Sequence, residues 1–169
     1  RFNDIGRSIQ NEEVIKLVNI GRLVEYKGHD LLLQICVELR NLGVNFSLDI
    51  FGMGQKKDWI INKIKELELT NNVYVKGGTL TPEDEYKKAD IYLHTSTEES
   101  FGLVFLEAMA CGTPVVTTDG LGNRDIIEHN NNGLFFYDRN SKKIATSIAE
   151  LFQNKNAYNN IRINGLKFC

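Results

Sequence analysis

The chain has 169 residues, of which 42% are apolar and 25% charged, with 22 acidic against 20 basic side chains. This length supports one domain with its own core, and hardly two. The formal charge of −2 argues against a nucleic-acid-binding module, which usually shows a clustered basic excess. The sequence has no run of 18 apolar residues and no charged-then-apolar leader, so we expect neither a membrane span nor a signal peptide.

The cysteines and histidines are too few and too scattered to suggest a disulfide scaffold or a metal site. The cysteines are Cys36, Cys111 and Cys169, and the histidines are His29, His94 and His129. An odd number of cysteines without C-x-x-C spacing is typical of a reducing compartment. We therefore expect a cytoplasmic protein without a metal. His94, at a strand end, is a candidate ligand contact, and Cys111 is a packing residue.

Both ends of the chain suggest a piece of a longer protein. The chain starts at Arg1 without a Met, and it stops at Cys169 inside a segment with recurring apolar residues. We expect residues 1–12 to be the remnant of a linker. Residues 155–169 are expected to begin a truncated helical segment, with residues 1–169 otherwise forming a single domain.

Strand-like apolar runs alternate with segments of helical periodicity along the whole chain. The predicted strands are Val14–Ile20, Phe46–Phe51, Val73–Val75, Ile91–His94, Pro114–Thr117 and Leu134–Tyr137. The predicted helices are His29–Leu42, a segment around Trp59–Leu67, one starting at Thr81-Pro82, Phe101–Cys111, a short one over Asp125–His129, and Ile144–Phe152. This alternation predicts an α/β fold with a doubly wound, Rossmann-like parallel sheet covered by helices on both faces.

In such a sheet, ligands bind beyond the carboxyl ends of the strands, where the strand order reverses. The segment after the fourth predicted strand, Glu98 to Glu107, crosses from a loop into a helix. Gly102 lets a ligand approach the helix N-terminus, which favours a phosphate. Glu107 lies about two turns inside an apolar helix, where a sugar diol would be a suitable partner for its carboxylate. The alternative is that Glu107 faces solvent.

Two further strand ends carry candidate ligand contacts. Arg22 and Lys27 follow the first strand, five residues apart and flanked by Gly21 and Gly28, and could clamp a diphosphate. A loop of this composition can equally be solvated. The Gly52-Met53-Gly54 turn after the second strand is a close-approach loop. It lacks the third glycine of the dinucleotide fingerprint, so it is weak evidence for NAD.

Taken together, these segments resemble one family. The matching stretches are NIGRLVEYKG, LDIFGMG, VYVKGG, ADIYLHTSTEESFGLVFLEAMACGTPVVTTD and NNNGLFF. In order and spacing they are similar to the C-terminal half of glycosyltransferase family 4, the group 1 glycosyl transferases with a GT-B fold. The most specific element is the pair of glutamates separated by seven residues, Glu99 and Glu107.

The resemblance implies a retaining glycosyltransferase that binds a UDP- or GDP-linked sugar and needs no other cofactor. The catalytic residues would be Arg22 and Lys27, on the diphosphate, and Glu99, beside the transferred sugar. The donor-binding residues would be Gly21, Gly52, Gly54, Lys76, Gly77, Ser100, Phe101, Gly102, Leu103 and Glu107. Among these, Glu107 would bind the ribose and the backbone at Lys76 and Gly77 would lie near the base.

By the same resemblance, no metal is expected, and the chain has no Asp-x-Asp motif. The N-terminal domain, which would bind a polysaccharide, glycolipid or other sugar acceptor and could meet a membrane surface, is absent. This piece alone is therefore expected not to transfer sugar. No nucleic-acid partner is expected.

Two positions depart from the family pattern. Ser100 stands where a glycine is usual. The loop Gly120–Asp125 stands where the family usually has a glycine-rich loop that contains a glutamate. Either Arg124 or Asp125 could supply that missing contact. Alternatives to the transferase are a GT-B epimerase or phosphorylase, or a non-catalytic doubly wound module. The last is disfavoured because the first strand ends in Gly21-Arg22 and not in clustered acids.

Overall fold

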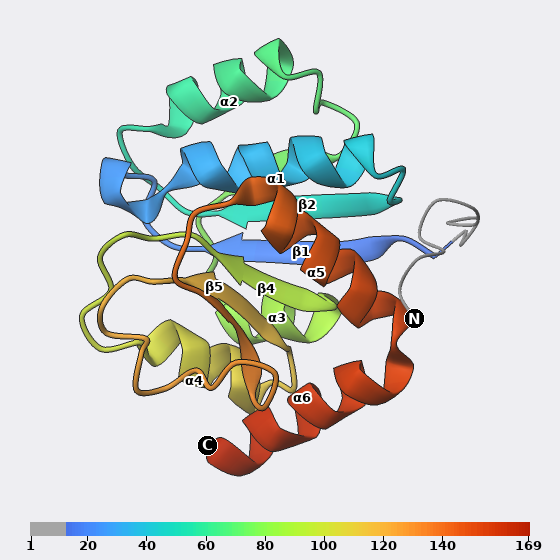
Figure 1. Ribbon diagram of the computed structural model, residues 1–169. Helices are drawn as coiled ribbons and strands as arrows, with labels where there is room; N and C mark the ends of the chain where they lie inside the picture. Colours follow the sequence, from blue (N-terminus) through green and yellow to red (C-terminus); the bar gives the residue numbers. More distant parts are fainter. Residues whose placement is uncertain (1–12) are drawn as a thin grey trace.

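The computed structural model describes residues 13–169, and the expected linker over residues 1–12 lies outside this range. Six strands form one sheet in the order β3-β2-β1-β4-β5-β6, and every neighbouring pair is parallel (Figure 1). The strands are β1 (Ile15–Ile20), β2 (Phe46–Phe51), β3 (Val73–Gly77), β4 (Ile91–His94), β5 (Val115–Thr118) and β6 (Gly133–Phe136). The predicted doubly wound sheet is confirmed.

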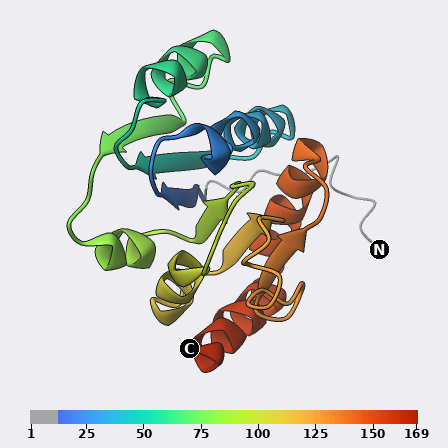
Figure 2. The same ribbon diagram turned by 90° about the vertical axis from the view of Figure 1, so that its left-hand side faces the viewer.

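Helices cover both faces of this sheet (Figure 2). They are the 3-10 helix η1 (Glu25–Lys27), α1 (His29–Asn41), α2 (Lys57–Glu66), α3 (Pro82–Lys88), α4 (Leu103–Ala110), α5 (Ser141–Gln153) and α6 (Lys155–Phe168). In Figure 2, α1 and α5 lie on one side of the strands, and α3 and α4 lie on the other. Helix α6 packs at the β6 end, against α4 and α5.

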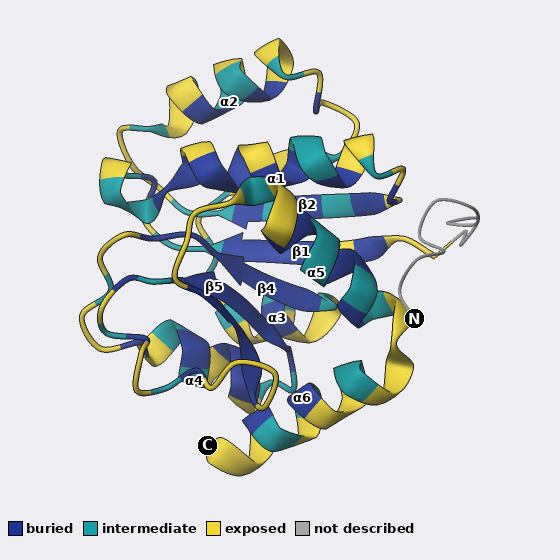
Figure 3. Ribbon diagram, viewed as in Figure 1, coloured by how far each residue is buried: buried dark blue, intermediate teal, exposed yellow. Residues whose placement is uncertain are grey.

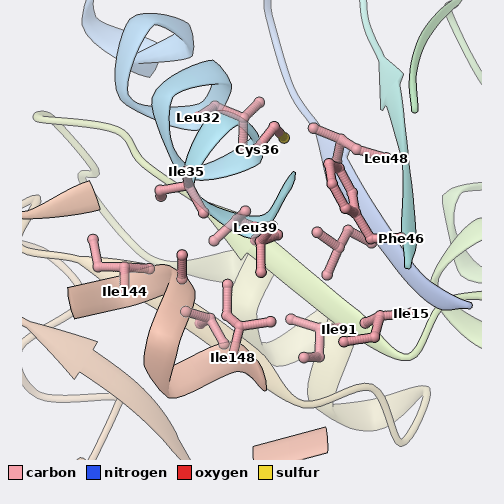
Figure 4. Packing of buried hydrophobic residues seen from close by; sticks show 14 of the residues in the cluster. Ile15, Leu32, Ile35, Cys36, Leu39, Phe46, Leu48, Ile91, Ile144 and Ile148 are labelled. Carbon is pink, nitrogen blue, oxygen red and sulfur yellow. The ribbon is translucent and has the colours of Figure 1, made fainter. Parts of the chain in front are cut away.

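Two apolar clusters, one on each face, hold the layers together. The larger one joins α1 and α5 to the sheet, with Ile35, Leu39 and Ile148 facing one another (Figure 4). The smaller one joins α3 and α4 to the other face through Tyr86, Phe105 and Met109. Because helices cover both of their faces, β4, β5 and β6 are buried at every residue (Figure 3).

The predicted short helix over Asp125–His129 is wrong, because this segment forms turns. The amides of Ile126 and Ile127 donate to the Asn123 carbonyl, which makes a single helical turn. The next amide, of Glu128, donates instead to the Asn132 side chain at 2.7 Å. The Asn132 amide group in turn donates to the Ile126 carbonyl at 2.8 Å. The helical hydrogen-bond ladder therefore cannot propagate.

The other elements match their predicted positions to within a few residues. Helix α4 begins at Leu103, so Glu107 lies about one turn inside it, whereas two turns were expected. The apolar residues near the end of the chain belong to α6. Within residues 13–169, no helix is long and apolar enough to cross a membrane.

The strand order places a switch point between β1 and β4. The chain leaves β1 toward β2 and β3 on one side, and it returns to β4, β5 and β6 on the other. The loops after these strands gather along one edge of the sheet, on the left in Figure 1. This edge is the expected ligand-binding edge of an open α/β sheet.

Candidate functional site

The loops that follow β1 and β4 are joined by hydrogen bonds at the switch point. The Thr97 amide donates to the Tyr26 carbonyl at 2.8 Å. The Ser96 hydroxyl reaches the same carbonyl at 2.9 Å, and the Thr95 hydroxyl donates to the Gly28 carbonyl at 2.9 Å. These bonds fix η1 against the segment that leads to Glu99. The two loops therefore act as one platform.

On this platform, Lys27 and Glu99 form an ion pair. The Lys27 Nζ atom lies 3.0 Å from Glu99 Oε2, and the two side chains are only 15% and 13% exposed. The residues are 72 positions apart in sequence. The structure thus brings together a predicted diphosphate-binding cation and the predicted sugar-binding carboxylate.

A second buried group touches the same carboxylate oxygen. His94, 2% exposed at the end of β4, places Nε2 3.4 Å from Glu99 Oε2. The His94 imidazole and then the Lys27 ammonium hold the pKa of Glu99 down to about 2. Glu99 is therefore an anion at neutral pH that only accepts hydrogen bonds. Burial lowers the pKa of His94, which favours the neutral imidazole.

The backbone of Glu99 is held by the loop after β5. The Glu99 amide donates to the Gly120 carbonyl at 2.8 Å, and the Gly122 amide donates to the Glu99 carbonyl at 2.8 Å. A Cβ atom at Gly122 would lie 2.0 Å from the Glu99 carbonyl oxygen, so no other residue fits here without a shift. Glu99 is therefore fixed at both its backbone and its side chain.

The side chain of Asn123 holds the loop after β5 in place by hydrogen bonds to that loop and to the end of β5. It is completely buried, and its side-chain amide donates to the Thr117 hydroxyl at 3.0 Å and the Thr118 carbonyl at 2.6 Å. Its carbonyl accepts from the Gly120 amide at 3.1 Å. The Asn123 side chain therefore fixes the path of the loop that holds Glu99.

Of the two candidates in the Gly120–Asp125 loop, only Asp125 has a side chain without a partner among the described residues. Arg124 pairs with Asp119 through two contacts, at 2.9 and 2.6 Å. Asp125 is exposed. The expectation that one of these two contacts a donor stays a prediction, with Asp125 the more accessible group.

Arg22 lies beside Lys27 but is exposed. Its guanidinium donates to the Tyr26 hydroxyl. Both cations lie within 5.7 Å of the centre of the Tyr26 ring. The pair therefore forms a small cationic surface after β1, with Lys27 half-buried beside Glu99 and Arg22 open to solvent.

The N-terminus of α4 provides free backbone donors beside Glu99. Gly102 occupies the N-cap position with a φ of 63°, no side chain caps this end, and the first turn holds no acid. Phe101 and Leu103 are 78% and 61% exposed, and Ser100 is also exposed. This arrangement leaves the first amides and the positive end of the helix dipole available to an anion.

Glu107 does not join the buried network. Its side chain is exposed on α4 and makes no hydrogen bond or ion pair with any of residues 13–169. In the chain without a ligand, Glu107 therefore faces solvent, which is the alternative that the sequence left open. An exposed carboxylate one turn inside the helix that borders the anion site is still free to accept from a ligand.

The glycines after β1 and β2 pack tightly against each other. A Cβ atom at Gly52 would lie 1.8 Å from the Gly21 carbonyl oxygen, and one at Gly54 would lie 2.3 Å from that of Leu23. The Gly52 amide donates to the Gly77 carbonyl at 2.7 Å. The backbone of three strand ends is therefore drawn together without side chains between them.

The side chain of Lys76 points elsewhere. Its Nζ lies 3.8 Å from Asp49 Oδ1 and 5.6 Å from the centre of the Tyr74 ring, within the exposed edge of the sheet. Only the backbone at Lys76 and Gly77 reaches the strand ends. This is the part of the segment that the resemblance relates to the base.

Sequence reasoning named His94 only as a candidate contact and missed Tyr92, Tyr26 and Asn123. Tyr26 bonds to Ser96, which is 70 positions away in sequence. The bonds of Asn123 to Thr117 and Thr118 span only six and five positions, but no known motif marks them. Among the described residues, no group of three or more His, Cys, Asp or Glu side chains is placed to hold a metal ion.

Comparisons with known proteins agree on one family. The family model described as "Glycosyl transferases group 1" matches residues 1–168. The chain is 37% identical over 112 residues to the poly(glycerol-phosphate) alpha-glucosyltransferase of Bacillus subtilis, which is 66% of the chain and 17% of the relative. It is 32% identical over 157 residues to the poly(ribitol-phosphate) alpha-N-acetylglucosaminyltransferase of Staphylococcus aureus, covering 91% of the chain and 31% of the relative.

A solved structure shows the same relationship in three dimensions. The chain superimposes on S. aureus TarM, crystallised as a mutant with fondaparinux, alpha-GlcNAc-glycerol and UDP, with a TM-score of 0.86 and 28% identity. The match covers 93% of the chain and 33% of TarM. The chain thus spans at most about a third of the length of these three proteins.

Proposed function

The chain belongs to the group 1 glycosyl transferases, and we propose that it is the donor-binding, C-terminal half of a retaining, metal-independent enzyme. This enzyme would move a sugar from a nucleoside diphosphate sugar to a polysaccharide, glycolipid or other sugar acceptor. The observation that carries the proposal is the Lys27–Glu99 pair at the switch point. It places a fixed cation and a fixed carboxylate side by side, as a diphosphate and its attached sugar require.

The donor would lie along the edge formed by the strand ends. Its diphosphate would meet Arg22, Lys27 and the free amides at the start of α4, and its sugar would meet Glu99. Glu107 would accept from the ribose hydroxyls. The base would rest on the backbone at Gly52 and Gly77, which favours no particular base. Binding of UDP in TarM supports a uridine donor, with GDP the alternative.

In the proposed reaction, the bond between the anomeric carbon and the diphosphate oxygen breaks and a bond to the acceptor oxygen forms. The acceptor hydroxyl loses its proton to the departing phosphate. Lys27, Arg22 and the helix amides would stabilise the negative charge that develops on the leaving group. These fixed charges can supply the stabilisation that a divalent cation provides in other transferases. Glu99 would orient the sugar and not attack it.

The names of two relatives support retention at the anomeric carbon. Both are alpha-transferases, of glucose and of N-acetylglucosamine. Because the UDP conjugates of these sugars are themselves alpha-linked, an alpha product from such a donor means retained configuration. We extend this outcome to the enzyme that carries this chain.

Thermal unfolding with a panel of nucleotides tests the proposal. The panel is UDP, GDP and ADP with their glucose, mannose and N-acetylglucosamine conjugates, each with and without EDTA. A ligand at 100 times its Kd should add about 2.7 kcal/mol of stability, which corresponds to a Tm increase of about 5 to 10 °C for a domain of this size. We expect one base to give this increase, with EDTA making no difference.

Variants connect such binding to the site. Arg22→Ala and Glu107→Ala should reduce the Tm increase, while the matched surface variants Lys63→Ala and Glu66→Ala, an ion pair on α2, should not. Equal responses in all four variants would show that the donor lies elsewhere. A nucleotide response that disappears with EDTA and returns with Mg²⁺ would contradict metal independence.

A further inference from the structure

His94 has no role in the reaction proposed above, yet it is the most deeply buried polar side chain that touches Glu99. Its Nε2 lies 3.4 Å from Glu99 Oε2, and its Nδ1 lies 2.9 Å from the Tyr92 hydroxyl. The ring stands edge-on to Phe105 of α4, with 5.0 Å between the ring centres. The other titratable groups around it are Lys27 and, at the start of α1, the buried His29.

The hydrogen-bond partners assign the tautomer of His94. A neutral imidazole carries one N–H and one lone pair. The Tyr92 hydroxyl lies 2.9 Å from His94 Nδ1 and 3.3 Å from the Ile20 carbonyl oxygen, and we assign its single hydrogen to the nearer acceptor, Nδ1. Glu99 is ionised and can only accept. The arrangement that satisfies both neighbours puts the proton on Nε2, directed at Glu99. The opposite tautomer would direct a lone pair at a carboxylate, which is repulsive.

Both side chains face the same oxygen of Glu99: Lys27 makes a hydrogen bond at 3.0 Å, whereas His94 Nε2 makes a longer contact at 3.4 Å and has no closer partner among the described residues. Lys27 Nζ and His94 Nε2 approach Oε2, and no described residue donates to Oε1. The loop after β5 holds the backbone of the same residue, through Gly120 and Gly122. One oxygen is thus fixed by the protein, and the other remains as an acceptor at the edge of the sheet.

We propose that His94, oriented by Tyr92, is a positioning residue that works with Lys27 to hold Glu99 Oε2, so that Oε1 is presented to a hydroxyl of the donor sugar. This inference rests on the proposed function, because it assigns the sugar-reading step of that same site. Through Glu99, His94 and Tyr92 of β4 would then set how much more tightly the site binds a nucleotide sugar than the nucleotide alone. His94 and Tyr92 themselves do not touch the ligand.

Two substitutions of His94 separate positioning from packing. His94→Leu keeps an apolar side chain of similar size and removes the donor. His94→Gln supplies an amide N–H that can replace Nε2–H. Tyr92→Phe is the mildest variant, since it removes one hydroxyl and leaves the ring packed against Tyr86. Circular dichroism and thermal unfolding establish which variants fold.

The first measurement needs no ligand. The Glu99 carboxyl is titrated by carbon-13 NMR in the parent and in each folded variant. We expect the pKa of Glu99 to rise in His94→Leu, to rise less in Tyr92→Phe, and to stay near the parent value in His94→Gln. An unchanged titration in His94→Leu and Tyr92→Phe would overturn the positioning role, whether or not the chain binds a nucleotide.

The second measurement compares the Kd for UDP with those for UDP-glucose and UDP-N-acetylglucosamine, and likewise GDP with GDP-mannose, by calorimetry. The parent should bind one conjugate more tightly than its nucleotide. His94→Leu should lose about tenfold in affinity for that conjugate, with nucleotide affinity unchanged and His94→Gln restoring the difference. Equal losses for nucleotide and conjugate, or no loss, would overturn the inference.

The two measurements also separate the two proposals. If the parent binds none of the nucleotides while Glu99 still responds to His94, the proposed function fails, and the assignment to a sugar fails with it. If nucleotides bind but no conjugate binds more tightly than its nucleotide, the donor-binding proposal stands and the sugar-presenting role of Glu99 is wrong.

Discussion

The two glutamates that bound the segment from β4 into α4 lie in opposite surroundings. Glu99 is held by an ion pair with Lys27, a 3.4 Å contact with His94 and two backbone hydrogen bonds, all of which exist without a ligand. Glu107, on a regular helix eight residues later, is exposed and has no partner among residues 13–169. The same side chain is thus organised in advance at one position and has no partner in the described chain at the other. If the donor binds as proposed, the fold sets the geometry around its sugar, and the ligand sets the geometry around its ribose.

The largest effect that we expect comes from Lys27→Ala. This change removes a cation from the proposed diphosphate site. It also removes the hydrogen bond that Lys27 donates to Glu99, so Glu99 becomes more like Glu107, which has no partner among the described residues. A lost charge-assisted hydrogen bond predicts about 10- to 100-fold weaker nucleoside diphosphate binding. Calorimetry against Lys63→Ala, a surface lysine of α2, checks this. Binding within twofold of the parent would remove Lys27 from the site.

Asn123→Ala tests the loop that holds the backbone of Glu99. It removes three hydrogen bonds from a fully buried side chain and leaves the Gly120 amide without its acceptor. The free energy of unfolding should fall by about 2 to 3 kcal/mol, measured by urea denaturation. The exposed Asn131→Ala is the control, and similar losses in both variants would argue against a special role for this loop.

Glu107→Ala should affect binding and not folding. Because its side chain has no protein partner, unfolding should change by less than about 0.5 kcal/mol. If Glu107 accepts from a ribose, nucleotide affinity should fall by about tenfold. If the variant binds nucleotides like the parent, Glu107 is a solvated surface residue with no part in binding. Glu99 and Glu107 would then differ in function as well as in their surroundings.

The last prediction concerns acid stability. The pKa of Glu99 is lowered from 4.5 to about 2 in the folded chain. Its ionised form therefore stabilises the fold fully above the unfolded value, and this contribution is lost as the pH falls from about 4.5 toward 2. Glu99→Gln should reduce the slope of stability against pH in this window, and Glu66→Gln should not. Parallel curves for parent and Glu99→Gln would show that the pair with Lys27 contributes nothing measurable.

Much of the fold could be predicted because it depends on short-range patterns. Apolar residues two apart in strands and three or four apart in helices place β1 to β6 and most helices within a few residues of the structure. The failure at Asp125–His129 has its cause just outside that segment, since the side chain of Asn132, four residues after Glu128, accepts from the amide that a helix would need. No periodicity within that segment could reveal this competition.

The sequence by itself determined the order of strands and helices, the glycines at the strand ends, and the spacing of Glu99 and Glu107. Only the tertiary structure decided which of these residues meet. Lys27 and Glu99 become neighbours because β1 and β4 are adjacent at the switch point. His94 faces Glu99 with its ring bonded to Tyr92 and packed edge-on against Phe105 of α4. Local patterns arise from the backbone of a few consecutive residues. Side-chain partners depend on which distant strands the packed core places side by side.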